Sequence, residues 1–183
     1  MDYPFAVMRL GAPHTGHLTL VDRMLTDYPQ AQVLILVGSA NLVGVPSAPL
    51  SWLARRDLLV RLLVAHEFPL ARLVLAPVAD VAEAGFCASW FQQLMGAAVG
   101  VMGTLPAAYY FGDDYQLTDF TLLVSLYPHL KLEPVHRLIP KSGTELRQAL
   151  VSQDPLLLDK YQEELALYPH PVQAEIRAIC QDV

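Results

Sequence analysis

The chain lacks the features that mark disulfide-rich, zinc-binding or metal-dependent folds. Its two cysteines, Cys87 and Cys180, are far apart and show no CxxC spacing. We therefore expect free thiols in a reducing compartment and no zinc cluster. Four histidines are scattered through the chain without metal-ligand spacing, so no metal site made of protein side chains is expected. These histidines are His66, His129, His136 and His170.

Positive charge is also scarce, and long apolar runs are absent. Lysine and arginine number 12 against 18 aspartates and glutamates, for a net charge of -6. A general nucleic-acid-binding protein is more often basic. No unbroken apolar run reaches the roughly 20 residues that span a bilayer, and no basic region followed by a long apolar stretch suggests a signal peptide. We expect a cytoplasmic protein that binds neither nucleic acid nor membranes.

Size and composition favour one folded unit. The chain has 183 residues, 54% hydrophobic and 16% charged, which allows a sizeable core. No repeat, low-complexity tract or linker divides it. We predict a single domain over residues 1–183, with a helical C-terminal segment from about residue 142. Apolar segments near the C-terminus permit a homo-oligomer.

Short apolar runs alternate with helical patterns along the chain. Uninterrupted runs of this length are typical of strands buried on both faces, and the last run alternates in a way that suits a sheet edge. Strands are predicted at 5–10, 32–37, 72–76, 107–111 and 132–138. Helices are predicted at 17–26, 51–66, 85–100 and 117–126, and then at 143–151, 156–167 and 172–181. Five such strand–helix units predict an α/β fold with a doubly wound, five-stranded parallel sheet and C-terminal helices.

The string His14-Thr15-Gly16-His17 directly follows the first strand and begins a helix. Two imidazoles three residues apart lie on nearly the same helix face. The N–H groups at a helix N-terminus attract anions, and Gly16 lets the backbone approach a ligand closely. The string therefore predicts a phosphate site.

A second string, Lys141-Ser142-Gly143-Thr144-Glu145-Leu146-Arg147, follows the last strand and begins another helix. Arg147 offers a planar guanidinium fork that suits a polyphosphate. Ser142 and the N–H groups of Gly143 and Thr144 form a second helix-end anion site.

Further polar segments follow two other strands. Gly38, Ser39 and Asn41 come after the second strand, and Gly112 comes after the fourth. In a doubly wound sheet, ligands bind at the carboxyl ends of the strands near the switch in strand order. All these segments are expected at that one edge, which points to chemistry on a nucleotide phosphate.

The two strings resemble signature motifs of a known superfamily. HTGH and KSGTELR look like the HxGH and ISxTxxR motifs of the nucleotidyltransferases, and MRLGAPHTGH resembles the opening of nicotinamide-nucleotide adenylyltransferases. The GSA loop at 38–40 and the helix after it are similar too. The resemblance runs through most of the chain and implies a Rossmann-like fold. It looks closest to the type found fused to a Nudix hydrolase, for which 183 residues leave no room.

The resemblance implies a reaction and a role for each matching residue. The reaction joins AMP from ATP to nicotinamide or nicotinate mononucleotide, with Mg²⁺ present and pyrophosphate released, as a step of NAD biosynthesis. The catalytic residues it implies are His14, His17 and Arg147. The ATP-binding residues are Arg9, Gly16, Gly112, Ser142, Gly143 and Thr144. The substrate-binding residues are Gly38, Ser39, Asn41, Arg55 and Trp90, of which Trp90 would stack on the nicotinamide ring.

The chain also departs from the family pattern. Cys87 stands three residues before Trp90, where the family often has an asparagine that can read a ring amide. The string after the fourth strand, 112–116, lacks the family's lysine, and Lys141 replaces an apolar residue. Two alternatives stay open: transfer to another phosphate acceptor such as phosphopantetheine, and a non-catalytic nucleotide-binding homologue. Arg55, Arg56 and Arg61 are otherwise expected on a solvated helix face.

Overall fold

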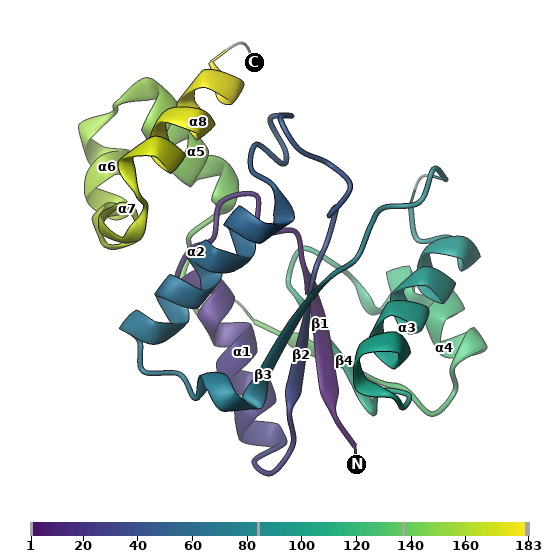
Figure 1. Ribbon diagram of the computed structural model, residues 1–183. Helices are drawn as coiled ribbons and strands as arrows, with labels where there is room; N and C mark the ends of the chain where they lie inside the picture. Colours follow the sequence, from purple (N-terminus) through teal and green to yellow (C-terminus); the bar gives the residue numbers. More distant parts are fainter. Residues whose placement is uncertain (1, 84, 137, 182–183) are drawn as a thin grey trace.

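A computed structural model describes residues 2–83, 85–136 and 138–181 and shows a parallel sheet with helices on both faces (Figure 1). The strand order is β3-β2-β1-β4-β5, with every neighbouring pair parallel. This confirms the predicted α/β doubly wound sheet, and the order reverses between β1 and β4. The described strands are β1 Pro4–Met8, β2 Val33–Val37, β3 Leu73–Pro77, β4 Ala108–Gly112 and β5 Lys131–Val135.

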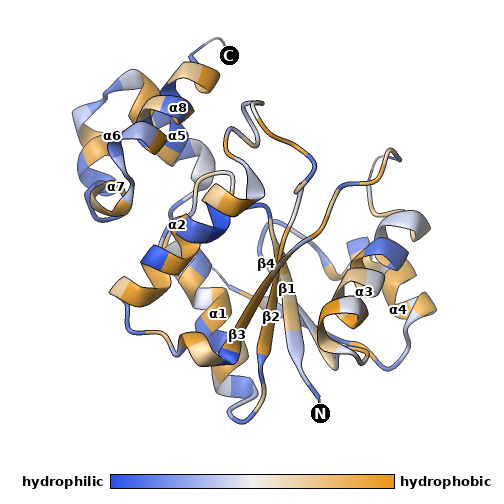
Figure 2. Cartoon of the chain, viewed as in Figure 1, coloured by the Kyte–Doolittle hydropathy of each residue, from blue (hydrophilic) through white to orange (hydrophobic). Residues whose placement is uncertain are grey.

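Two helix layers enclose the sheet. Residues of α1 and α2 pack on one face of the strands, and residues of α3 and α4 pack on the other. Strands β2 and β3 are hydrophobic along most of their length, as their orange colour in Figure 2 shows. The first four helices are α1 Gly16–Asp27, α2 Trp52–Ala65, α3 Ala88–Met102 and α4 Thr121–Leu126. No helix in the described part of the chain is both long and apolar enough to cross a membrane.

The C-terminal helices form a third apolar cluster beside the sheet. They contact Ala12, in the loop after β1, and Leu50 and Leu58, which lie just before and within α2. Each fully buried aliphatic side chain of such a cluster contributes roughly 1.5–3 kcal/mol to folding. These helices are α5 Gly143–Ser152, α6 Pro155–Lys160, α7 Gln162–Leu167 and α8 His170–Cys180.

Several predicted boundaries are wrong for local reasons. Helix α3 starts at Ala88 rather than 85, because Gly85 has a left-handed φ of 82°, and it runs on to Met102 before Gly103 ends it at a φ of 76°. The segment 117–126 begins as a 3₁₀ turn, Leu117–Phe120. The predicted helix 156–167 is two helices.

Tyr161 separates these two helices. It ends α6 and precedes α7 with a φ of -112°, while its hydroxyl bonds to the start of α5. The predicted fifth strand, 132–138, ends early: β5 stops at Val135, and residue 137 lies outside the described residues. β5 does lie at a sheet edge, as expected, but so does β3, in which Leu73 and Ala76 are buried and the other side chains are partly buried or exposed.

Candidate functional site

Sharp turns follow the two central strands that end at the site. Leu10, beyond β1, has a φ of 53°, and Ser39, beyond β2, has a φ of 52°. A left-handed conformation is uncommon for residues other than glycine and costs energy that the surrounding fold must supply. Both side chains are buried. The turn at Leu10 ends the predicted strand early and redirects the chain toward α1.

The two histidines of the HTGH string are joined by hydrogen bonds within the loop. The Gly16 N–H donates to His14 Nδ1 at 3.1 Å, and the His14 N–H lies 3.2 Å from His17 Nδ1. The ring centroids are 4.0 Å apart. Because Nδ1 of His14 accepts a bond, its neutral ring carries the proton on Nε2. That nitrogen can then donate to an anion.

Gly16 makes room for the His14 ring. A Cβ atom at residue 16 would lie 2.8 Å from His14 Cε1 and Nδ1, closer than packed atoms allow. The expected reason for this glycine was close approach of the backbone to a ligand. The structure adds a second reason, because any side chain here displaces His14.

A small cavity of about 120 Å³ lies beside the histidines. The predicted residues that line it are His14, Gly16, His17 and Gly112. His136 also lines it, although the sequence pattern suggested no role for this residue. His136 Nδ1 lies 2.8 Å from Asp113 Oδ1. Its place directly after β5 was the available signal, since that is where the carboxyl end of a parallel strand meets the site.

The second string places Arg147 at the end of β1. Ser142 precedes α5, and its Oγ accepts a bond from the Glu145 N–H at 3.1 Å. A Cβ at Gly11 would lie 2.7 Å from Arg147 Nη1, so the guanidinium lies directly over the backbone of Gly11. Arg147 Nη2 donates to Thr144 Oγ1 at 3.2 Å. The glycine at 11 therefore admits the arginine.

The start of α5 also lies close to the loop after β1. A Cβ at Gly143 would lie 3.0 Å from the Ala12 carbonyl oxygen. The two predicted anion-binding helix starts are thus neighbours in space, although they are more than a hundred residues apart in sequence.

Three arginines concentrate positive charge around these loops. Burial lowers the pKa of the Arg147 guanidinium, and nearby Arg9 lowers it further. Burial also lowers the pKa of Arg55, again with Arg9 contributing. None of the ion pairs between described residues involves Arg9, Arg55 or Arg147. In an acidic protein, this cluster suits an anionic ligand.

Arg55 lies behind the site rather than on the solvated helix face expected for it. Its side chain is fully buried. Its Nη1 donates to the Arg9 carbonyl and, at 2.9 Å, to the Gly38 carbonyl, and Nη2 donates to the Ser39 carbonyl at 3.0 Å. It therefore ties together the ends of β1 and β2. These bonds use three of the five guanidinium N–H groups, and among the described residues the buried Nε of Arg55 has no hydrogen-bond partner.

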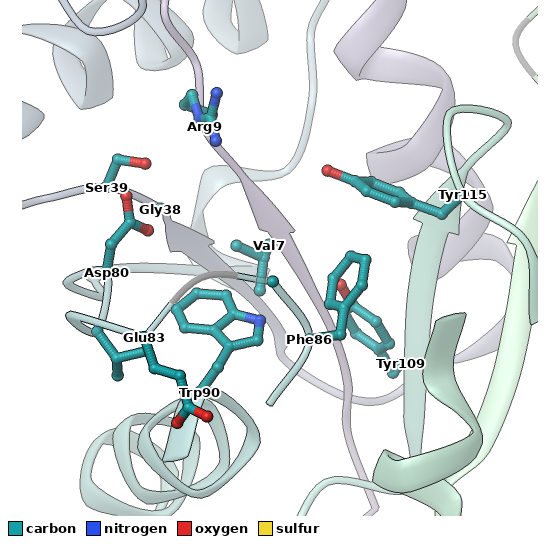
Figure 3. Close-up of a pocket in the computed structure, with 12 residues that line it drawn as sticks. Val7, Arg9, Gly38, Ser39, Asp80, Glu83, Phe86, Trp90, Tyr109 and Tyr115 are labelled. Atoms are coloured by element: carbon teal, nitrogen blue, oxygen red, sulfur yellow. The ribbon is translucent and has the colours of Figure 1, made fainter. Parts of the chain in front are cut away.

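A larger cavity of about 410 Å³ also borders β1 (Figure 3). The predicted residues that line it are Arg9, Gly38, Ser39 and Trp90. Val7 lines both cavities, so both border β1 near the switch in strand order. Sequence reasoning missed other lining residues, namely Asp80, Glu83, Phe86 and Tyr115. They lie in irregular segments where no periodicity or motif marks a residue.

Two further residues stand outside this cavity. Asn41, predicted to bind substrate, accepts a bond from the Asp80 N–H at 2.8 Å and so ties the loop after β2 to the loop after β3. Cys87 lies immediately before α3, with its Sγ 3.0 Å from Ser89 Oγ. Ser89 in turn donates to Glu83 at 2.8 Å, so Cys87 belongs to a polar chain at the cavity rim.

The side chains that the structure describes offer no ready-made metal centre. Within residues 2–83, 85–136 and 138–181, no group of three or more His, Cys, Asp or Glu side chains is placed to hold an ion. A divalent cation that acts here would need ligands from elsewhere, such as phosphate oxygens and water.

No protein-family model matches the chain, and no curated protein matches its sequence. Solved structures do match its fold. A bifunctional NMN adenylyltransferase/ADP ribose pyrophosphatase from Francisella tularensis, complexed with AMP and a manganese ion, superposes with a TM-score of 0.70 at 19% identity. A second structure with the same two named activities, also from Francisella tularensis, gives a TM-score of 0.73 at 17% identity. Each match covers 97% of this chain but only 52% of the solved chain, so the protein spans about half their length.

Proposed function

We propose that the protein is an adenylyltransferase that joins AMP from ATP to nicotinamide mononucleotide and releases pyrophosphate, forming NAD. One observation carries the proposal. The histidine pair lines a cavity at β1, Arg147 lies over Gly11 just beyond that strand, and β1 also borders a cavity that contains Trp90. A phosphate site therefore adjoins a site that suits an aromatic ring, at the switch point where a doubly wound sheet binds ligands. The shared fold of the two Francisella enzymes supports it.

The chemistry needs no covalent intermediate. A phosphate oxygen of the mononucleotide attacks the α-phosphorus of ATP in line. The bond between the α-phosphorus and the oxygen that bridges it to the β-phosphate breaks, and pyrophosphate leaves with the bonding electrons. His14 and His17 donate hydrogen bonds to the α-phosphate oxygens as negative charge develops there. Arg147 and Arg9 hold the β- and γ-phosphates. Positioning and charge stabilisation account for catalysis in phosphoryl-type transfers of this kind.

Mg²⁺ enters this reaction as the magnesium complex of ATP. The phosphate oxygens and water supply its ligands, which fits the lack of an acidic cluster among the described residues. The manganese ion and AMP in one Francisella structure are consistent with this arrangement.

The larger cavity favours nicotinamide over nicotinate. Trp90 and Phe86 offer aromatic faces, while Asp80 and Glu83 carry negative charge (Figure 3). A pyridinium ring with a neutral amide is attracted both by the aromatic faces and by the negative charges. The carboxylate of nicotinate would face two like charges. The same charges oppose the phosphopantetheine alternative, since that acceptor brings no cationic ring.

The test measures pyrophosphate release by the purified protein with MgATP and one acceptor at a time: nicotinamide mononucleotide, nicotinate mononucleotide or phosphopantetheine. We expect release with the nicotinamide compound, a slower rate with nicotinate, and loss of both in His17→Ala. The matched control is His170→Ala, since His170 lies at the start of α8, far along the chain from the HTGH string.

The other outcomes are equally informative. Release with phosphopantetheine alone would replace the proposed acceptor. ATP binding without pyrophosphate release from any acceptor would identify a non-catalytic nucleotide-binding protein.

A further inference from the structure

A buried carboxylate lies between the two phosphate-binding strings. Glu164 belongs to α7 and is fully buried. Its Oε1 accepts two hydrogen bonds from Thr15, one from the N–H at 2.9 Å and one from Oγ1 at 2.7 Å. Lys141 Nζ reaches both carboxylate oxygens, at 2.9 and 3.0 Å. One side chain thus joins the middle of HTGH to the first residue of KSGTELR.

These bonds keep Glu164 ionised despite its burial. Burial alone raises the pKa of a carboxyl group, but here the bonds from Thr15 and Lys141 prevail and the pKa lies below its ordinary value. A buried charge is tolerated only when it is paired and hydrogen-bonded. The Glu164–Lys141 pair meets that condition, which explains why Lys141 stands where the family pattern has an apolar residue.

Thr15 also does not cap the helix that it precedes. It directly precedes α1, where a threonine hydroxyl commonly accepts a bond from the helix backbone, yet it makes no such cap. Its hydroxyl and its N–H both point to Glu164 instead. The loop is therefore oriented by α7 rather than by its own helix.

Two tyrosines that flank Glu164 make similar contacts. The Ser142 N–H donates to Tyr161 Oη at 2.8 Å, and Tyr168 Oη donates to the Pro13 carbonyl at 2.6 Å. The segment 161–168 therefore contacts the loop before α1 and the loop before α5. Glu164 is the member of this segment that bonds to both.

We propose that Glu164 is a positioning residue that holds the two phosphate-binding loops at the spacing a triphosphate requires. This inference rests on the proposed function. Glu164 lines neither cavity beside β1, so it acts through Thr15 and Lys141. A ligand that spans both loops depends on their spacing, whereas a ligand with one phosphate does not. Displacements of about 1 Å at such sites cost on the order of 100-fold in rate.

The test compares the affinities of ATP and AMP for Glu164→Gln, measured by isothermal titration calorimetry. Glutamine keeps the size and an acceptor oxygen for Thr15 but loses the charge that holds Lys141. We expect the dissociation constant for ATP to rise by about tenfold or more, while that for AMP stays within about twofold. Loss of a merely structural contact would weaken both nucleotides together or neither.

Glu163→Gln is the matched control. Glu163 neighbours Glu164 on α7, but its carboxylate is half exposed, pairs with His66 at 3.0 Å and lies 4.0 Å from Lys141 Nζ. Its substitution leaves the ratio of ATP to AMP affinity unchanged. Thr15→Val is a milder second variant, because it removes the 2.7 Å hydroxyl bond and keeps the backbone bond. It shifts the ratio in the same direction by a smaller factor.

The outcomes separate the inference from its premise. A wild-type protein that binds neither nucleotide overturns the proposed function. A wild-type protein that prefers ATP, with the same preference in folded Glu164→Gln and Thr15→Val, overturns the positioning role alone. Thermal unfolding of each variant establishes that the titrated protein is folded.

Discussion

At the scale of single residues, two glycines determine where the site's key side chains lie. Gly16 leaves space for the His14 ring, and Gly11 leaves space for the Arg147 guanidinium. Neither has the left-handed backbone that makes glycine obligatory in turns. Their requirement is therefore steric: at Gly16 it concerns the His14 ring, and at Gly11 it concerns both the Arg147 guanidinium and the Ser47 carbonyl oxygen, which a Cβ would also approach to 2.7 Å.

Gly16→Ala is expected to reduce activity while the fold remains intact. The new methyl group would lie 2.8 Å from the His14 ring, so the ring must move away from its position at the cavity. We expect pyrophosphate release to fall by about tenfold or more, with thermal unfolding little changed because alanine suits a helix start. A variant with wild-type rates would contradict the packing argument.

Gly100→Ala is the control for this substitution. Gly100 is exposed within α3, and a Cβ there meets nothing within 4 Å. This variant is expected to gain about 0.5–1 kcal/mol of stability at unchanged activity.

Arg55→Met is expected to destabilise the protein strongly. It leaves three backbone carbonyls without their guanidinium donor, at a point where two strand ends meet. We expect a loss of about 2–4 kcal/mol in the free energy of unfolding, measured by urea denaturation. Arg61→Met, on the exposed side of the same helix, should change it by no more than about 0.5 kcal/mol. Equal effects of the two variants would show that Arg55 does not hold the strand ends.

The same residues show how far the sequence could predict the site. The two motifs predict roles for His14, His17 and Arg147 because their spacing is local and specific, and these roles stay a prediction. Arg55 was predicted to bind substrate by resemblance and otherwise to lie on a solvated face. Its burial was missed because it depends on carbonyls beyond the ends of two strands. No sequence pattern marked Glu164, because its partner Thr15 is 149 residues away.

At the scale of secondary structure elements, two helices begin with comparable serine caps. Ser51 accepts a bond from the Ala54 N–H at 3.3 Å at the start of α2. Ser142 accepts one from the Glu145 N–H at 3.1 Å at the start of α5. The two caps are chemically alike, but only the start of α5 belongs to the proposed triphosphate site.

Alanine substitutions should separate capping from ligand binding. Ser51→Ala and Ser142→Ala are each expected to cost about 1 kcal/mol of stability through loss of the cap. Only Ser142→Ala should also raise the KM for ATP in the pyrophosphate assay. If the KM for ATP is unchanged in both variants, Ser142 is a cap and nothing more.

The strands and their positions were predictable because short, uninterrupted apolar runs between turn residues are typical of buried strands. The helix boundaries were less predictable from the sequence. Tyr161 interrupts a periodic pattern because its hydroxyl bonds to Ser142 and Glu145 across the helical cluster. Such a break arises from tertiary contacts, which a local pattern does not contain.

At the scale of the whole molecule, buried tyrosines set an alkaline limit to stability. Burial raises the pKa of Tyr3 and of Tyr161 to about 12, from an ordinary value of 10.0. The unfolded chain therefore loses these protons first as the pH rises. The stabilisation is complete below about pH 10 and is lost progressively between about pH 10 and pH 12.

We expect the midpoint of thermal unfolding to be steady from about pH 8 to about pH 9.5 and to fall above about pH 10. Tyrosinate absorbance, followed with and without denaturant, should place the ionisation of the folded protein at higher pH. Tyr3→Phe removes one of the shifted groups, so its curve should fall less steeply. A midpoint that stays constant to about pH 12 would mean that these hydroxyls ionise equally in both states.

The contact between Thr15 and Glu164 also has a consequence for synthesis. The ribosome releases the HTGH loop early, whereas α7 emerges only after nearly all of the described chain has been translated. A nascent chain can form its first strands and helices in that interval. It carries both histidines but not the carboxylate that orients their loop. If Glu164 has the proposed positioning role, ATP binding at full strength begins only when translation has passed α7, and chains truncated before that point should bind ATP more weakly.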